Sequence, residues 1–182
     1  MSKRRLLFYV IITAIFAGCA DYKLHYSEGN GIGTNTTFKK RFLDKTFYFI
    51  GDAGGTSTGK TTDALQALKK IVDTASGENS YTIFLGDNIY DEGLPSKNSK
   101  EREDAEHKIN AQITSVDDFD GKVFFIPGNH DWRDSGLKGV KRQEKYIEKA
   151  LNDKNAFQPE NGCPIKKVNV SDDIVMLSLI HI

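Results

Sequence analysis

The stretch Val123 to Trp132 reads Val-Phe-Phe-Ile-Pro-Gly-Asn-His-Asp-Trp, an apolar run followed directly by a tight turn and polar side chains. A continuous apolar run such as Val123 to Ile126 is typical of a parallel strand that is covered on both faces. The Pro-Gly pair that follows ends the strand. In open α/β sheets, functional groups collect just past the carboxyl ends of the strands. We therefore expect the polar residues 129–131 to lie at a functional site.

The same arrangement occurs twice more upstream. Thr46 to Ile50 runs into Gly51-Asp52, and Tyr81 to Leu85 runs into Gly86-Asp87-Asn88-Ile89-Tyr90. Three apolar strands, each followed by glycine and then by an oxygen-bearing side chain, would bring their polar residues to one edge of one sheet. The residues expected there are Asp52, Asp87, Tyr90 and Asn129, and oxygen ligands of this kind suit a hard metal ion.

The motifs Gly-Asp-x-Gly, Gly-Asp-Asn-x-Tyr and Gly-Asn-His-Asp, in this order, resemble those of the calcineurin-like metallophosphoesterases. The broader family usually has Asp-x-His in the first motif, whereas this chain has Asp52-Ala53-Gly54 and places Tyr90 in the second. That exchange is typical of the purple acid phosphatase type. The likeness covers roughly residues 45–178 and extends to a group of bacterial envelope lipoproteins. It implies an α/β fold, namely the N-terminal half of a four-layer α-β-β-α sandwich.

The resemblance implies a phosphoesterase that hydrolyses phosphomonoesters or diesters with two metal ions, which polarise a phosphoryl oxygen and steady the leaving oxygen. Asp87 would bridge the ions, Asp52 and Tyr90 would complete the protein ligands of the first, and Asn129 would bind the second. An unperturbed tyrosine loses its proton only at about pH 10, so a tyrosine ligand indicates a strongly Lewis-acidic ion such as Fe(III). The family implies Zn, Mn or Fe(II) as its partner.

By the same resemblance, His130 is expected to contact the phosphate and to protonate the leaving alkoxide. Asp131 is expected to orient the imidazole ring through a hydrogen bond. The substrate would be a phosphate ester. The chain has 25 basic and 25 acidic residues, a balance that gives no indication of a nucleic-acid partner.

The N-terminus has the features of an export signal. Ser2-Lys3-Arg4-Arg5 is a positive start, and the apolar run from Leu6 to Ala17 is too short to span a bilayer. Phe16-Ala17-Gly18-Cys19 resembles the bacterial lipobox. We therefore expect a signal peptide over residues 1–18, a flexible tether over 19–44 and a phosphoesterase domain over 45–182. Lipidation of Cys19 would anchor the protein in the cell envelope, in the outer membrane or facing the periplasm, and would leave Cys163 without a disulfide partner.

Two other classes of function remain open. Gly54 to Thr61 matches the phosphate-binding P-loop pattern, in which Lys60 would reach the phosphates of a nucleotide. Against this reading, the loop begins three residues after its strand, and an exported protein meets little nucleoside triphosphate. The third class is a non-catalytic envelope module that kept the sheet without its ligands.

Further elements follow from hydrophobic spacing. Helices are expected over residues 61–75, 100–113 and 139–150, with either Thr61 or Thr62 as the cap of the first, and His107 as a surface or partly packed histidine. Residues 168–179 should form two strands joined by a turn at 171–173.

The sequence also predicts that the domain is incomplete. Family members carry later histidine motifs, whereas only His181 follows His130, and we assign it no role. We therefore expect residues 1–182 alone to be inactive. Ile174 to Ile180 should be a central strand whose sheet continues beyond it, and Ser178 to Ile182 resembles translated sequencing adapter.

Overall fold

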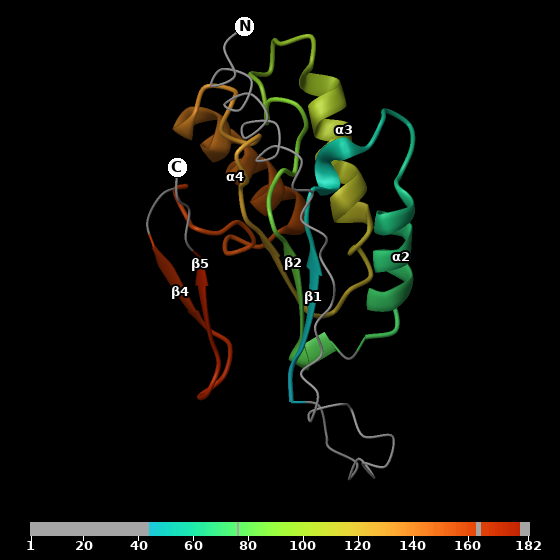
Figure 1. Ribbon diagram of the computed structural model, residues 1–182, viewed down its shortest axis with the longest axis vertical. Coiled ribbons are helices and arrows are strands. Elements are labelled where there is room, and N and C mark those ends of the chain that lie inside the picture. The colour runs from blue at the N-terminus through green and yellow to red at the C-terminus, as the bar shows by residue number, and fades with distance from the viewer. Residues whose placement is uncertain (1–43, 76, 163–164, 179–182) are drawn as a thin grey trace, which may run out of the picture. The chain divides into compact units, whose positions relative to one another are not determined.

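The computed structural model describes residues 44–75, 77–162 and 165–178 (Figure 1). The predicted signal peptide, the tether up to residue 43, the lipidation site Cys19, and Cys163 and His181 lie outside these ranges. No helix in the described ranges is both long enough and apolar enough to cross a membrane.

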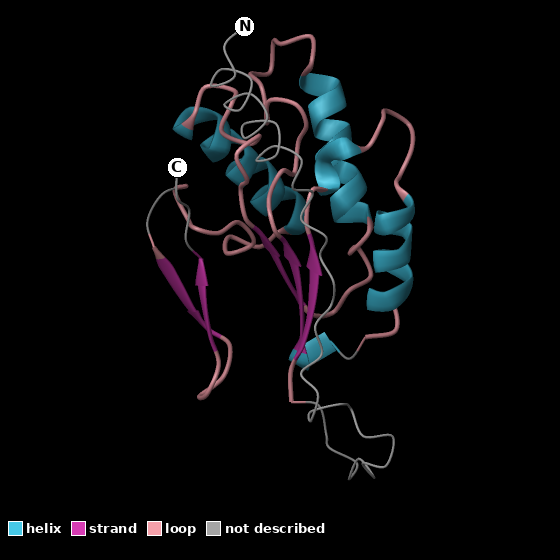
Figure 2. Cartoon of the chain, in the orientation of Figure 1, coloured by secondary structure: helices cyan, strands magenta, loops and turns pink. Residues whose placement is uncertain are grey.

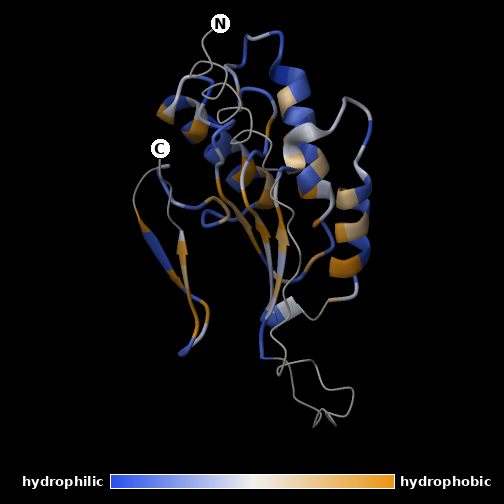
Figure 3. Ribbon diagram, in the orientation of Figure 1, coloured by the Kyte–Doolittle hydropathy of each residue, from blue (hydrophilic) through white to orange (hydrophobic). Residues whose placement is uncertain are grey.

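The predicted α/β fold is confirmed. Strands β1 (Thr46–Ile50), β2 (Ser80–Phe84) and β3 (Lys122–Phe125) form a parallel sheet in the order β1-β2-β3. Figure 2 shows the strands in magenta, with helices beside them in cyan. The strands are largely hydrophobic, as Figure 3 shows, because β2 and β3 are covered on both faces. The edge strand β1 is less covered, and its Phe49 is 62% exposed.

Helices cover one face of the sheet. They are α2 (Asp63–Val72), α3 (Arg102–Thr114) and α4 (Leu137–Leu151), all within a few residues of their predicted bounds. They share one core with strand residues Phe84 and Phe125, whose rings stack 4.2 Å apart. Short 3₁₀ helices follow β1 (η1, Ala53–Gly55) and precede β2 (η2, Gly77–Asn79).

Helix α2 shows how sequence spacing sets burial. The Thr62 side chain accepts a hydrogen bond from the Leu65 backbone N–H at 3.3 Å, as one of the two expected caps. Leu65, Leu68 and Val72 are buried, because this spacing keeps them on one side of the helix. The apolar residue Ile71 is 50% exposed, since it lies about a quarter-turn away from Val72.

The second face of the sheet is covered by a hairpin. Strands β4 (Lys166–Asn169) and β5 (Val175–Ser178) pair antiparallel, with the turn between them where the sequence predicts it. Val168 and Met176 pack against a cluster formed by Tyr81, Ile83 and Phe124. The expected central strand over 174–180 is described only up to residue 178, and its place in a larger sheet stays a prediction. Among the described residues β5 pairs only with β4, and its Leu177 is 58% exposed.

Candidate metal centre

The turns that follow β1 and β2 are joined by backbone hydrogen bonds. The N–H of Asp52 donates to the Gly86 carbonyl at 3.2 Å, and the N–H of Gly54 donates to the Asp87 carbonyl at 3.0 Å. The N–H of Tyr90 donates back to the Gly54 carbonyl at 3.2 Å. The first two motifs are therefore one bonded unit at the carboxyl end of the sheet.

Two glycines allow the turns to approach this closely. A Cβ on Gly54 would lie 2.5 Å from the Asp87 carbonyl oxygen, and a Cβ on Gly128 would lie 2.2 Å from Asp87 Oδ1. Real Cβ atoms do not approach other atoms so closely, so a larger residue at either position would displace the aspartate. These two glycines therefore allow the Asp87 carboxylate to keep its position.

Asp52 and Asp87 both have a left-handed backbone conformation, with φ of 55° and 51°. Aspartate tolerates this region better than most residues, but the conformation still costs free energy. Unfavourable backbone geometry of this kind concentrates at functional sites. Its occurrence in both aspartates supports a role for the pair.

Three oxygen-bearing side chains meet here, as the sequence predicts. The Tyr90 hydroxyl donates to Asp52 Oδ1 and lies 3.1 Å from Asp87 Oδ2. The hydrogen bond to Asp52, desolvation and the nearby charge of Asp87 raise the pKa of the Tyr90 phenol well above its ordinary value. The phenol proton of Tyr90 therefore lies between the carboxylates of Asp52 and Asp87. A hard cation at the same place would find carboxylate and phenol oxygens already gathered, so this donor set fits such an ion.

The backbone of Tyr90 is fixed on both sides. Its N–H donates to the Gly54 carbonyl, and its carbonyl accepts a hydrogen bond from Nζ of Lys108 on α3. Lys108 also pairs with Asp104 one helical turn earlier, at 2.6 Å. The position of the phenol therefore depends on α3 as well as on its own loop.

His130 lies beside this oxygen cluster. Its ring centroid is 4.4 Å from that of Tyr90, and its Nε2 is 4.0 Å from Asp87 Oδ2. Its Nδ1 is 2.7 Å from the Asp91 carbonyl oxygen. Because a carbonyl oxygen can only accept, Nδ1 carries a hydrogen, and Nε2 is the ring nitrogen that approaches the Asp87 carboxylate.

Asp131 does not bond to the imidazole ring, contrary to the expectation that it orients the ring. Its fully buried carboxylate accepts hydrogen bonds from the backbone N–H groups of Gly128 (2.7 Å), Asn88 (3.1 Å) and Ile89 (3.1 Å). It also accepts from the side-chain amides of Asn88 (3.3 Å) and Gln143 (3.1 Å). Burial raises its pKa to about 6, and the hydrogen bonds limit the rise. The carboxylate ties the second and third motifs together.

Asn129 lies in the turn that surrounds the Asp87 carboxylate, since the N–H of the next residue, His130, donates to Asp87 Oδ1 at 3.0 Å. Its side chain is exposed. Within the described ranges, no three histidine, cysteine, aspartate or glutamate side chains gather at metal-binding distance. The predicted ligand set therefore depends on Tyr90 and Asn129 in addition to the two aspartates.

Sequence reasoning missed two buried glutamines, one on α3 and one on α4, whose side chains donate hydrogen bonds to residues of the site. Gln143 of α4 donates to Asp131, and Gln112 of α3 donates to the Asn88 carbonyl at 2.7 Å. Both are fully buried. A signal was present, since Gln143 falls three residues after Val140 and four before Ile147, on the apolar side of its helix. A polar residue at such a position needs a buried partner.

The P-loop reading does not agree with the geometry. A phosphate loop needs free backbone N–H groups, whereas the N–H of Gly54 is bonded to Asp87 and that of Lys60 to the Ser57 carbonyl at 3.0 Å. Helix α2 begins only at Asp63, so Lys60 does not lie in its first turn. His107 is partly packed, as expected, with Nε2 3.0 Å from the Lys60 carbonyl oxygen.

A family model described as calcineurin-like phosphoesterase matches residues 45–176. The chain belongs to this family, whose members are metal-dependent phosphoester hydrolases. Comparison with curated proteins gives no match, and neither does comparison with solved structures.

Proposed function

We propose that this protein is a phosphoesterase of the purple acid phosphatase type that acts on phosphomonoesters or diesters with two metal ions. The observation that carries the proposal is the meeting of Asp52, Asp87 and Tyr90 oxygens at the carboxyl end of the sheet. A phenol beside two carboxylates suits a strongly Lewis-acidic ion, so Fe(III) is the proposed occupant, with Zn, Mn or Fe(II) as its partner.

Each side chain then has a distinct role. Asp52, Asp87 and Tyr90 would hold the first ion, Asp87 would also reach the second, and Asn129 would give the second a neutral oxygen. When bound, the ions supply Lewis-acid polarisation of the phosphoryl group. His130, with Nδ1 bonded to a carbonyl oxygen, presents Nε2 as the proton donor to the leaving alkoxide.

The test begins with metal content. Four predicted ligands are fewer than two ions need, since even zinc takes about four each. We therefore infer that residues 1–182 alone are inactive, and metal binding is the first measurement. Asp87→Asn removes charge from the bridging position and should lower the bound metal, measured by elemental analysis, together with any hydrolysis of an aryl phosphate.

The matched control for this experiment is Asp172→Asn, an identical change at an exposed residue of the hairpin turn. It should leave metal content and hydrolysis unchanged. If Asp87→Asn kept the metal content and hydrolysis of the wild type, the two-metal assignment would be wrong.

We also propose that Cys19 carries the lipid that holds the protein at the bacterial cell envelope. The support is the positive start, the short apolar run and the lipobox-like residues before the cysteine. The proposal stands apart from the chemistry of the metal centre, and labelling with a fatty-acid analogue tests it.

A further inference from the structure

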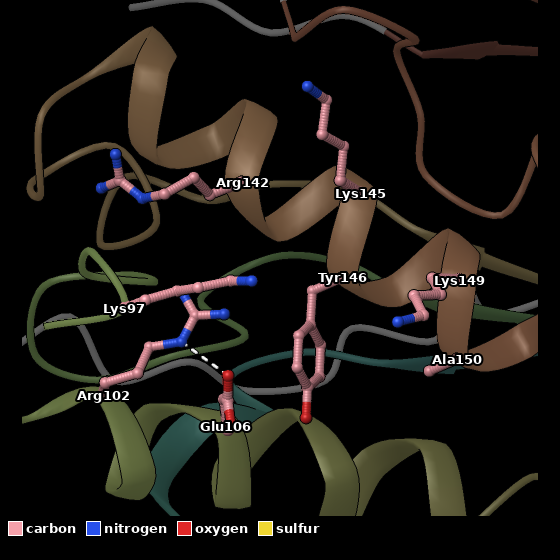
Figure 4. Close-up of a pocket in the computed structure, with 8 residues that line it drawn as sticks. All are labelled: Lys97, Arg102, Glu106, Arg142, Lys145, Tyr146, Lys149 and Ala150. Carbon is pink, nitrogen blue, oxygen red and sulfur yellow. Dashed lines mark hydrogen bonds and ion pairs between the residues drawn. The ribbon is translucent and has the colours of Figure 1, made fainter.

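A pocket of about 600 Å³ lies between α3 and α4 and shares no residue with the candidate metal centre. Its volume falls in the range of about 300–1,000 Å³ that small-molecule sites occupy. Lys97 and Arg102 extend into the space between the two helices, with the Tyr146 ring beside them (Figure 4). Five of the residues that line it are basic and one is acidic; they are Lys97, Arg102, Arg142, Lys145, Lys149 and Glu106.

This excess of positive charge is local. The whole chain has equal numbers of basic and acidic residues, 25 of each. Arg102 pairs with Glu106 at 2.6 Å, and Arg142 pairs with Asp134. In the part of the chain that the structure describes, no carboxylate pairs with the three lysines of the pocket. A concave surface lined by one sign of charge focuses its potential and attracts counter-ions.

The floor of the pocket is less polar than its rim. The Tyr146 ring lies 5.6 Å from the Arg102 guanidinium carbon, and its hydroxyl is bonded to Asn110 at 3.0 Å. Ala150 and the aliphatic stems of the lysines complete the lining. Such a floor accommodates an apolar group, which a bare inorganic ion does not have.

The two arginines are held in place before any ligand binds. Arg102 is only 9% exposed and donates through Nη1 to the Pro95 carbonyl at 2.6 Å. Arg142 donates through Nε to the adjacent Leu94 carbonyl at 3.1 Å. Fixed guanidinium groups lose little side-chain entropy on binding, so they favour recognition of planar or multiply charged anions.

We propose that the pocket between α3 and α4 binds a small organic anion with at least two negative charges and an apolar body. The rim cations recognise the charged group, and the floor around Tyr146 receives the apolar body. The site is independent of the metal centre and of the reaction proposed for it.

The test uses the full chain, treated with a chelator, and phenylphosphonate as the probe in calorimetric titrations. One saturable site is expected, with affinity that falls as salt is added. Lys145→Glu combined with Lys149→Glu should weaken binding by about tenfold or more, because two nearby charges change sign. Lys138→Glu reverses one such charge on α4 outside the pocket and should leave the affinity within about twofold, well below the tenfold effect that 1.4 kcal/mol represents.

Three outcomes would overturn the proposal. The first is no saturable binding, and the second is an equal loss in Lys138→Glu, which would mean a diffuse basic surface. The third is loss of binding in Asp87→Asn, which would place the probe at the metal centre. Inorganic phosphate should bind more weakly than phenylphosphonate, and equal affinity would contradict the apolar part of the site. Circular dichroism of each variant confirms that it folds.

Discussion

Replacement of the buried Asp131 by alanine should destabilise the protein by about 3 kcal/mol. The change removes the acceptor from the backbone N–H groups of Gly128, Asn88 and Ile89. A buried donor without a partner costs about 1–3 kcal/mol, so three cost about 6 kcal/mol at the middle of that range. The carboxylate is itself unfavourable there, since burial raises its pKa from 3.8 to about 6. That shift corresponds to about 3 kcal/mol at neutral pH, which offsets half of the loss.

Asp131→Asn should cost less, about 1 kcal/mol. It removes the buried charge and keeps one acceptor oxygen, which can serve Gly128 and Asn88 in place of Oδ2. The new amide nitrogen would face Gln143. The buried Oε1 of Gln143 has no partner among the described residues and would accept from the new amide after rotation of its own side-chain amide. The Ile89 N–H and the second N–H of the new amide would then face each other without an acceptor. Two such losses cost about 4 kcal/mol at the middle of the range, and relief of the buried charge, about 3 kcal/mol, leaves a cost of about 1 kcal/mol.

Urea unfolding of metal-free protein at neutral pH measures both changes. Trp132, the only tryptophan of the chain, follows Asp131 directly and provides the fluorescence signal. The midpoint should fall with an unchanged slope, in the order alanine before asparagine. Asp91→Ala removes an exposed carboxylate from the neighbouring loop and should change stability by less than about 0.5 kcal/mol. A loss below about 1 kcal/mol for Asp131→Ala would refute the reasoning, since it would mean that these donors find water at no cost.

Three further predictions concern iron, pH and lipidation. If Tyr90 binds Fe(III), iron-loaded protein should show a visible absorption band that Tyr90→Phe removes while the iron stays bound; a band that survives would exclude the phenolate. Burial and nearby acidic residues raise the pKa of Glu148 to about 6, so its charge destabilises the fold as pH rises from about 4.5 to 6 and above. Glu148→Gln should therefore stabilise the protein in thermal unfolding by about 1 kcal/mol at neutral pH, after discounting for partial exposure, and should have no effect at pH 4 or below. Glu103→Gln, at an exposed site on α3, is the control and should not change stability with pH in this way. Cys19→Ser should abolish incorporation of a fatty-acid analogue, and equal incorporation would refute the lipobox.

Much of the site could be predicted because its geometry follows from strand order. Parallel neighbouring strands end at one edge, so the residues after β1 and β2 must lie close together, and Asp52 and Asp87 do share the Tyr90 hydroxyl. Helix positions were predictable because apolar residues at helical spacing lie on one side of a helix, which packs against the core. Burial was less predictable. Leu85 continues the apolar run of β2, yet it lies past the end of the strand and is 50% exposed.

The role of Asp131 could not be predicted, because adjacency in sequence does not mean that two side chains face each other. Successive residues of a tight turn point in different directions, and Asp131 turns inward to bond Gly128, three residues earlier, while the His130 imidazole remains at the surface of the site. The donors of Asn88 and Ile89 follow Asp87 directly, so their bonds to Asp131 fix the backbone next to Asp87. The last carboxylate of the third motif therefore positions the proposed ligand Asp87 of the second motif. Substitutions at Asp131 should disturb metal binding through Asp87 before they disturb the proton transfer proposed for the imidazole.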